Sequence, residues 1–207
     1  MATISTGQSN WANASARGKA RKAGLIDDTR MRQLLQQSPD SIAASIAEFG
    51  YRDELDEYAD KLSGVDLVEA ALNHNMDRDL NQVLGFCQGH LKGLVSIYVE
   101  RFTYQKLKTA LRAIRSGVSL EIVSSQVLPE QNEANRPWLE LVNDSETLQD
   151  AVSALEGTQF ERALTDLDGN DDLMAVEDRS EERRAGNECR SRWAPYHSKK
   201  KTHAHII

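Results

Sequence analysis

The longest helical pattern in the chain follows Ser63-Gly64 and extends to Phe102. It reads SGVDLVEAALNHNMDRDLNQVLGFCQGHLKGLVSIYVERF (residues 63–102). Apolar side chains recur in it at steps of three to five residues, as on one face of a helix: Leu67, Leu72, Met76, Leu80, Val83, Cys87, Leu91, Leu94, Tyr98 and Phe102. Polar residues occupy the opposite face: Asp66, Glu69, Asn73, Asp77, Asp79, Gln88, Lys92 and Glu100. We predict one long helix of about ten turns, of the kind found in helical bundles.

Three glycines, Gly85, Gly89 and Gly93, lie four residues apart inside this pattern. Each costs a helix about 1 kcal/mol relative to alanine, so the row needs a structural reason. The flanking polar residues exclude a membrane-embedded helix pair. We predict that a neighbouring helix of the same protein packs closely against the row, with a subunit interface as the alternative.

Shorter helices are predicted on both sides of the long one. Residues 13–24 suit a short basic helix, and Asp27 or Asp28 can cap the next, which carries Met31, Leu34 and Leu35. Ser38-Pro39 is a helix start signal, an N-cap serine followed by proline in the first turn. Further predicted elements are listed by residue: an apolar face of Ile42, Ile46 and Phe49, a stop at Gly50, a helix from Tyr51, and helices over 103–117, 119–127, WLELV (138–142) and SETLQDAVSALEGTQFERAL (145–164).

A weak internal repeat relates the two ends of this region. Ile46, Tyr51 and Leu55 recur as Leu155, Phe160 and Leu164, each displaced by 109 residues, and Leu34-Leu35 recurs as Leu141-Val142, displaced by 107. Such a repeat indicates a fold assembled from similar helical units.

The overall composition is that of a folded, helix-rich protein. Apolar residues make up 40% and charged residues 28% of the 207 residues, and there are only four prolines. No apolar run is long enough to span a bilayer, and the first residues do not form a secretory signal peptide. Two cysteines, Cys87 and Cys189, do not make a disulfide framework, so we expect a reducing compartment.

The net charge of −7 is unevenly distributed. Residues 179–207 carry eight basic and three acidic residues, a charge of +5, so residues 1–178 carry −12. A body this acidic repels nucleic acid. It suits either a salty cytoplasm or docking on basic partners, and composition does not separate the two.

The last 29 residues, RSEERRAGNECRSRWAPYHSKKKTHAHII (179–207), have no helical or strand periodicity. Their opening residues match an in-frame translation of AGATCGGAAGAG, and the continuation resembles translated sequencing adapter. We interpret residues 179–207 as a non-native tail and exclude them from the fold. Two alternatives are a natural basic disordered tail and a metal site of Cys189, His197, His203 and His205, although that spacing matches no zinc pattern.

No catalytic motif is found in the chain. Phosphate-binding glycine loops, nucleophile elbows and zinc-protease signatures are all missing. The acidic segment DLDGNDD (166–172) lacks the ligand order of a calcium loop, and we interpret it as a solvated turn. His74 and His90 lie sixteen residues apart without a ligand partner, and Cys87 lies on the apolar stripe as expected of a core residue. We therefore predict no catalytic, cofactor-binding or metal-binding residues and no cofactor.

The order of these features resembles the C subunit of archaeal A-type ATP synthases, a relative of the d subunit of V-type ATPases. The segments that carry the resemblance are SARGKARKAGLIDD (15–28), MRQLLQQSPDSIAASIAEFGYRDEL (31–55), SGVDLVEAALNHNM (63–76) and YVERFTYQKLKTALRAIRSG (98–117). Residues 136–164 resemble the start of the second unit of that family. The match departs from the family in its first helix, where Trp11, Ala14 and Gly18 replace its usual Tyr and Val pattern.

The resemblance implies an all-α fold of three similar helical units, of which this chain holds one and part of a second. We expect a disordered N-terminus (1–12), a first helical unit (13–128) and a truncated second unit (129–178). The resemblance also implies a non-catalytic rotor subunit, peripheral on the cytoplasmic face of the membrane. Its partners would be the proteolipid ring and the central stalk, with no nucleic acid and no small-molecule ligand.

An unrelated helical adaptor that binds partners through grooves between helices is the alternative function. The basic residues near the N-terminus, Arg17, Lys19, Arg21 and Lys22, could face a partner, although a solvated face is the simpler expectation.

Overall fold

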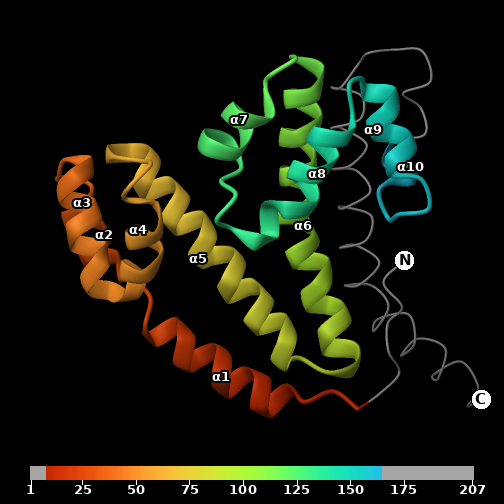
Figure 1. The fold of residues 1–207 in the computed structure, drawn as a ribbon. Helices are drawn as coiled ribbons and strands as arrows, with labels where there is room; N and C mark the ends of the chain where they lie inside the picture. Colours follow the sequence, from red (N-terminus) through yellow and green to blue (C-terminus); the bar gives the residue numbers. More distant parts are fainter. Residues whose placement is uncertain (1–7, 165–207) are drawn as a thin grey trace, which may run out of the picture.

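The computed structural model describes residues 8–164, and every regular element in that range is helical. Two long helices, α5 (Gly64–Phe86) and α6 (Gly89–Arg115), run in opposite directions and diverge from a tight turn, so that they form a V (Figure 1). This agrees with the predicted all-α class. The prediction of a single long helix that follows Ser63-Gly64 and extends to Phe102 is wrong, because the chain reverses in the middle of it.

The reversal occurs at two residues in extended conformation. Cys87 has φ −80° and ψ 143°, and Gln88 has φ −131° and ψ 157°. Gly89 then begins α6 at φ 57°, a left-handed conformation that favours glycine. The apolar spacing continues through the turn, so periodicity alone did not reveal the break. Cys87 and Leu91 of the stripe are buried, whereas Leu72 and Tyr98 are exposed. The helix predicted separately over 103–117 is the C-terminal part of α6, and it does end at Ser116-Gly117.

The predicted packing role of the glycine row is also wrong. The turn separates Gly85 on α5 from Gly89 and Gly93 on α6, so the three do not share a helix face. A Cβ added at Gly85 would meet no atom within 4 Å, so no neighbouring helix approaches closely there. Gly89 instead adopts the left-handed backbone conformation with which α6 begins.

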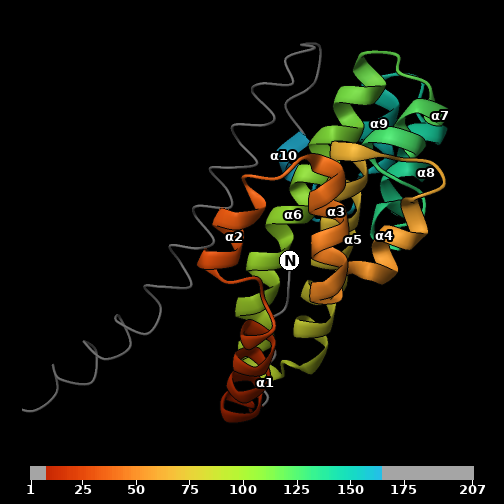
Figure 2. The ribbon, with the colours of Figure 1, turned by 90° about the vertical axis from the view of Figure 1, so that its left-hand side faces the viewer.

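Short helices surround the N-terminal half of α5: α2 (Asp28–Leu34), α3 (Pro39–Ile46) and α4 (Arg52–Tyr58) (Figures 1 and 2). Their predicted start and stop signals are confirmed. The side chains of Asp27 and Ser38 accept hydrogen bonds from backbone N–H groups of the first turns of α2 and α3. A π-type segment (Ala47–Tyr51) links α3 to α4, and Gly50 takes φ 92° at the kink. Leu34, Ile46, Leu55 and Tyr58 bury their side chains against α5.

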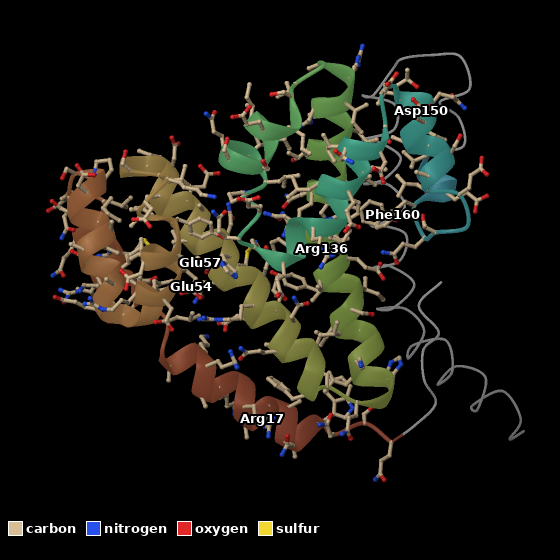
Figure 3. All side chains as sticks on the ribbon, viewed as in Figure 1. Arg17, Glu54, Glu57, Arg136, Asp150 and Phe160 are labelled. Carbon is tan, nitrogen blue, oxygen red and sulfur yellow. The ribbon has the colours of Figure 1, made fainter. Side chains whose placement is uncertain are left out.

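A second core forms around the C-terminal half of α6. The elements that follow α6 are α7 (Leu120–Ile122), a π-type turn (Val123–Val127), a 3₁₀ turn (Glu133–Asn135), α8 (Arg136–Asp144), α9 (Leu148–Ala154) and α10 (Glu161–Leu164). Phe160 packs edge-on against Tyr104 of α6 and Trp138 of α8, with ring centroids 5.1 and 5.5 Å away (Figure 3). This core joins residues on both sides of position 128, so the helical packing does not divide there.

The first helix, α1 (Trp11–Ala23), begins beside the closed end of the V and runs along the C-terminal half of α5 (Figure 1). It begins two residues before the predicted start at residue 13. The side chain of Asn10 brackets the α5–α6 turn: its Nδ2 donates to the carbonyl of Phe86 at 2.8 Å, and its Oδ1 accepts from the Gln88 N–H at 3.0 Å. Ala14, Cys87 and Leu91 form a small core beneath α1. Residues 9–12 therefore belong to the folded unit, in contrast to the predicted disordered segment 1–12.

Two predicted features lie outside the described residues, the acidic turn at 166–172 and the tail at 179–207. Among residues 8–164, none of the helices is both long enough and apolar enough to cross a membrane.

Candidate functional site

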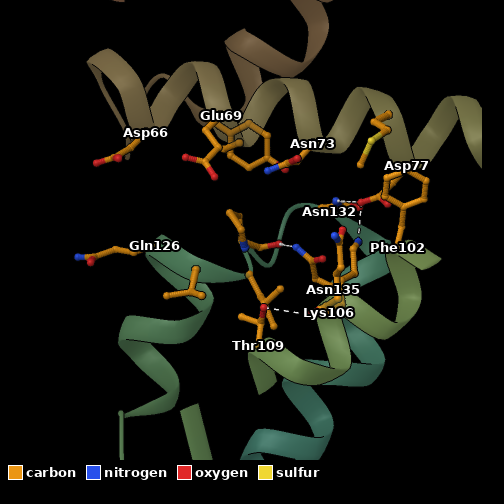
Figure 4. Close-up of a pocket in the computed structure, with 17 residues that line it drawn as sticks. Asp66, Glu69, Asn73, Asp77, Phe102, Lys106, Thr109, Gln126, Asn132 and Asn135 are labelled. Atoms are coloured by element: carbon orange, nitrogen blue, oxygen red, sulfur yellow. Dashed lines mark hydrogen bonds and ion pairs between the residues drawn. The ribbon is translucent and has the colours of Figure 1, made fainter. Parts of the chain in front are cut away.

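A pocket of about 460 Å³ opens between the arms of the V, where α5 faces α6 and the segment that follows α7 (Figure 4). One wall comes from α5, the other from α6, and the floor from the chain between Gln126 and Asn135. The lining residues are Tyr58, Asp66, Glu69, Ala70, Asn73, Met76, Asp77, Phe102, Gln105, Lys106, Thr109, Gln126, Val127, Leu128, Pro129, Asn132 and Asn135. The pocket is thus lined by both polar and apolar side chains, with two aromatic residues among them.

A buried ion pair crosses the pocket and joins its two walls. Nζ of Lys106 on α6 lies 2.5 Å from Oδ2 of Asp77 on α5, and Nδ2 of Asn132 donates to the same oxygen at 2.6 Å. Asp77 is only 7% exposed, although the helical pattern placed it on the polar face of a long helix. That expectation is wrong because α6 folds back and covers this part of α5. No spacing in the sequence relates Asp77, Lys106 and Asn132, since Lys106 and Asn132 lie 29 and 55 residues from Asp77.

A second polar cluster lies behind the pocket, between α4 and α5 (Figure 3). Glu54 is 2% exposed, and its Oε1 lies 2.5 Å from Nη1 of Arg78 and accepts a hydrogen bond from Asn75. Nδ1 of His74 lies 3.0 Å from the Tyr58 hydroxyl and 3.4 Å from Oε2 of Glu57. His74 is therefore a packed residue of the interface between α4 and α5.

The hydroxyl of Tyr58 keeps its proton in this environment. Burial, reinforced by the carboxylates of Glu57, Asp77 and Glu54, raises its pKa well above the ordinary value. Burial also raises the pKa of the Cys87 thiol, which lies in the core as predicted and is not activated as a nucleophile. His90 is exposed on α6.

Within residues 8–164, no three His, Cys, Asp or Glu side chains converge closely enough to hold a metal ion. The alternative metal site of Cys189, His197, His203 and His205 lies outside the described residues. The pocket presents carboxylates, side-chain amides, one ammonium group and aromatic residues.

The basic residues of α1 divide between an internal and an external role. Arg21 forms an ion pair with Asp79 of α5 at 2.7 Å and a hydrogen bond with Gln82. The guanidinium of Arg17 lies over the Phe86 ring, 5.5 Å from its centroid (Figure 3). Both therefore hold α1 against α5. Lys19 and Lys22 are exposed and stay available to a partner or to solvent.

Comparison with known proteins identifies the family. The ATP synthase (C/AC39) subunit family matches residues 14–182. The C subunit of the A-type ATP synthase of Haloquadratum walsbyi is 31% identical over 180 residues, which cover 84% of this chain and 52% of that protein. Proteins of the same name from Haloferax volcanii and Methanococcoides burtonii are 34% and 30% identical, over 75% and 78% of this chain and 44% and 45% of theirs.

The chain therefore spans about half the length of the curated relatives it matches. No solved structure matches it. The matched region includes α5, α6 and all the residues that line the pocket. The family match and the helical fold agree with the resemblance found in the sequence, and the chain belongs to the ATP synthase (C/AC39) subunit family.

Proposed function

We propose that this chain is part of a non-catalytic central-rotor subunit of an A-type ATP synthase. In this role it links the central stalk to the proteolipid ring and transmits torque between them, as a peripheral protein on the cytoplasmic face of the membrane. The observation that carries the proposal is the family match over residues 14–182, together with relatives that are named as C subunits of A-type ATP synthases.

The internal bracing of the V supports a mechanical role. A torque-bearing part must resist relative movement of its helices, and the Asp77–Lys106 pair and Asn132 tie α5 to α6 and to the floor segment. Asn10 and Arg21 tie α1 to the closed end of the V and to α5. These contacts join elements far apart in sequence, so they stiffen the frame as a whole.

The alternative function is that of a helical adaptor outside any ATP synthase. The pocket between α5 and α6 favours it, because grooves between helices are common binding sites for partner segments. Both functions use the same surfaces, and only the identity of the partners separates them.

Affinity purification from an archaeon with an A-type ATP synthase tests the proposal. The 207-residue chain carries an affinity tag, membranes are extracted in mild detergent, and co-purified proteins are identified by mass spectrometry. We expect proteolipid and central-stalk subunits in the eluate. A Leu111→Asp variant, which places a carboxylate at a 1% exposed core position, is the control for binding that depends on the fold. Recovery of other proteins without ring or stalk subunits would overturn the rotor function and favour the adaptor.

A further inference from the structure

The pocket between α5 and α6 contains polar groups that the protein itself leaves without partners. Asp66 and Glu69 line it from α5, and neither carboxylate has an ion pair or hydrogen bond within the described part of the chain (Figure 4). Asn73, one turn further along α5, likewise has a free side-chain amide among these residues. Asp66 and Glu69 are exposed, and exposed carboxylates do not by themselves indicate a ligand.

A buried side chain at the pocket floor supplies independent evidence. Asn135 lines the pocket and is only 3% exposed. Its Nδ2 donates to the carbonyl of Pro129 at 3.0 Å, but its Oδ1 has no hydrogen-bond partner among residues 8–164. An unpaired buried acceptor is unfavourable, so a ligand that donates a hydrogen bond to it would remove that penalty.

The charge of the pocket selects a cation. Its lining holds three carboxylates (Asp66, Glu69 and Asp77) and one ammonium (Lys106), so it carries a net charge of −2. Lys106 is paired with Asp77, which leaves the charges of Asp66 and Glu69 uncompensated. The uncompensated charged groups at the pocket are therefore carboxylates, which accept hydrogen bonds.

The lining of the pocket favours a guanidinium group, because Phe102 contributes partly exposed ring surface to the walls. A guanidinium has five N–H donors in one plane and stacks on aromatic faces, so it can satisfy several spread-out acceptors at once. A metal ion is disfavoured because no three ligands converge within the described residues.

We propose that this pocket binds the guanidinium of an arginine side chain presented by a partner protein. The identity of that partner rests on the proposed function, in which it is a neighbouring subunit of the rotor. The binding itself does not, because it follows from the pocket of this chain alone. Asp66 and Glu69 supply the charge, and Asn73 and Asn135 supply further acceptors.

Binding of a guanidinium probe to the isolated 207-residue chain tests the site. N-acetyl-arginine amide is titrated into ¹⁵N-labelled protein, and side-chain amide shifts of Asn73 and Asn135 are followed by NMR. We expect saturable shifts, with N-acetyl-lysine amide binding more weakly. The double variant Asp66→Asn/Glu69→Gln should weaken binding by about tenfold, because it removes both uncompensated charges. Glu48→Gln, at an exposed position between α3 and α4, should leave it unchanged. Unsaturable shifts, or equal affinity in the double variant, would overturn the proposal.

A second arm distinguishes a partner's arginine from a free small cation. A photo-reactive benzoylphenylalanine replaces Gln126 at the exposed rim of the pocket, and Glu48 in the control. After irradiation of the assembled complex, we expect a covalent adduct at position 126 whose partner peptide contains an arginine. If the probe binds but no such adduct forms, the claim that a partner protein supplies the guanidinium is wrong. This outcome is distinct from failure of the rotor function, which is measured by co-purification of ring and stalk subunits.

Discussion

The carboxylate of Asp77 on α5 and the ammonium of Lys106 on α6 lie 2.5 Å apart inside the V. Both side chains are largely buried, with 9% and 15% of their surface exposed. Two charges at such a depth are tolerated because each compensates the lost hydration of the other. The hydrogen bond from Asn132 satisfies the same oxygen and fixes the floor segment to the pair. These contacts connect α5 to α6 in the part of the V where the two helices diverge.

Removing the ammonium should strongly destabilise the fold. In Lys106→Met, Asp77 stays buried with only Asn132 as a partner, and breaking a buried pair in this way costs about 3 kcal/mol. The free energy of unfolding, measured by urea denaturation followed by circular dichroism, should fall by about that amount.

The control for this variant is an exposed ion pair of the same type. Lys61 and Glu130 lie 2.8 Å apart, but their side chains are 53% and 59% exposed. Lys61→Met should therefore cost less than about 1 kcal/mol. Equal losses in the two variants would show that burial of the Asp77–Lys106 pair does not stabilise the V.

The bracket formed by Asn10 should control access to Cys87. Burial makes this thiol 4% exposed and raises its pKa, so alkylation requires local opening of the turn. In a Cys189→Ser background, Asn10→Ala should speed labelling by iodoacetamide several-fold, because both hydrogen bonds to the turn are lost. Asn13→Ala, exposed on α1, is the matched control and should label at the original rate. An unchanged rate in Asn10→Ala would mean that Asn10 does not hold the turn closed.

The two glycines beside the turn should respond in opposite directions to alanine. Gly89→Ala places a Cβ at φ 57° and should destabilise the protein by about 1–2 kcal/mol. Gly85→Ala lies within α5, with open space around the new Cβ, and should stabilise it by about 0.5–1 kcal/mol. Thermal and urea unfolding of both variants measures the difference. A stability gain in Gly89→Ala would be incompatible with the left-handed turn.

The capping residue Asp150 of α9 should make the free energy of unfolding depend on pH in the acidic range. The Thr147 side chain and backbone donate hydrogen bonds to Asp150, and they lower the pKa of this carboxyl below its ordinary value. A pKa lower in the folded than in the unfolded state stabilises the fold above the unfolded pKa, and this contribution fades as the pH falls through the folded pKa.

Thr147→Val removes the hydroxyl, so the pKa of Asp150 should rise towards its ordinary value and the acid-dependent loss of stability should shrink. An NMR pH titration of the Asp150 side chain measures the shift. Thr29→Val, at an exposed position on α2, serves as the control and should leave that titration unchanged. A Thr147→Val chain with an unshifted carboxyl would exclude the capping hydroxyl as the cause.

The repeat predicted from the sequence remains a prediction, but burial agrees with part of it. Ile46 and Leu55 in the first copy, and Leu155 and Leu164 in the second, are all buried. The correspondence of Leu34-Leu35 with Leu141-Val142 is poorer, because Leu35 is 77% exposed. Residues at corresponding positions of the two copies are therefore not all buried to the same extent.

Local features of this protein were determined by its sequence. The helical class, the caps at Asp27 and Ser38 and the stops at Gly50 and Gly117 all depend on residues within one or two turns of each other. Capping hydrogen bonds and left-handed glycines act over such short distances, so their signals are complete in the local sequence. The order of the quoted segments also identified the family.

Only the tertiary structure decided the turn at Cys87–Gln88, and with it the pocket. The apolar spacing continues without interruption through the turn, so periodicity does not distinguish one long helix from two. The chain reverses because α1 covers Cys87 and Asn10 satisfies the exposed backbone groups of the turn. That reversal brings Lys106 and Asn132 to Asp77, and a charge expected in solvent becomes a buried brace. Burial and pairing of such groups depend on residues distant in sequence, and only the folded chain brings them together.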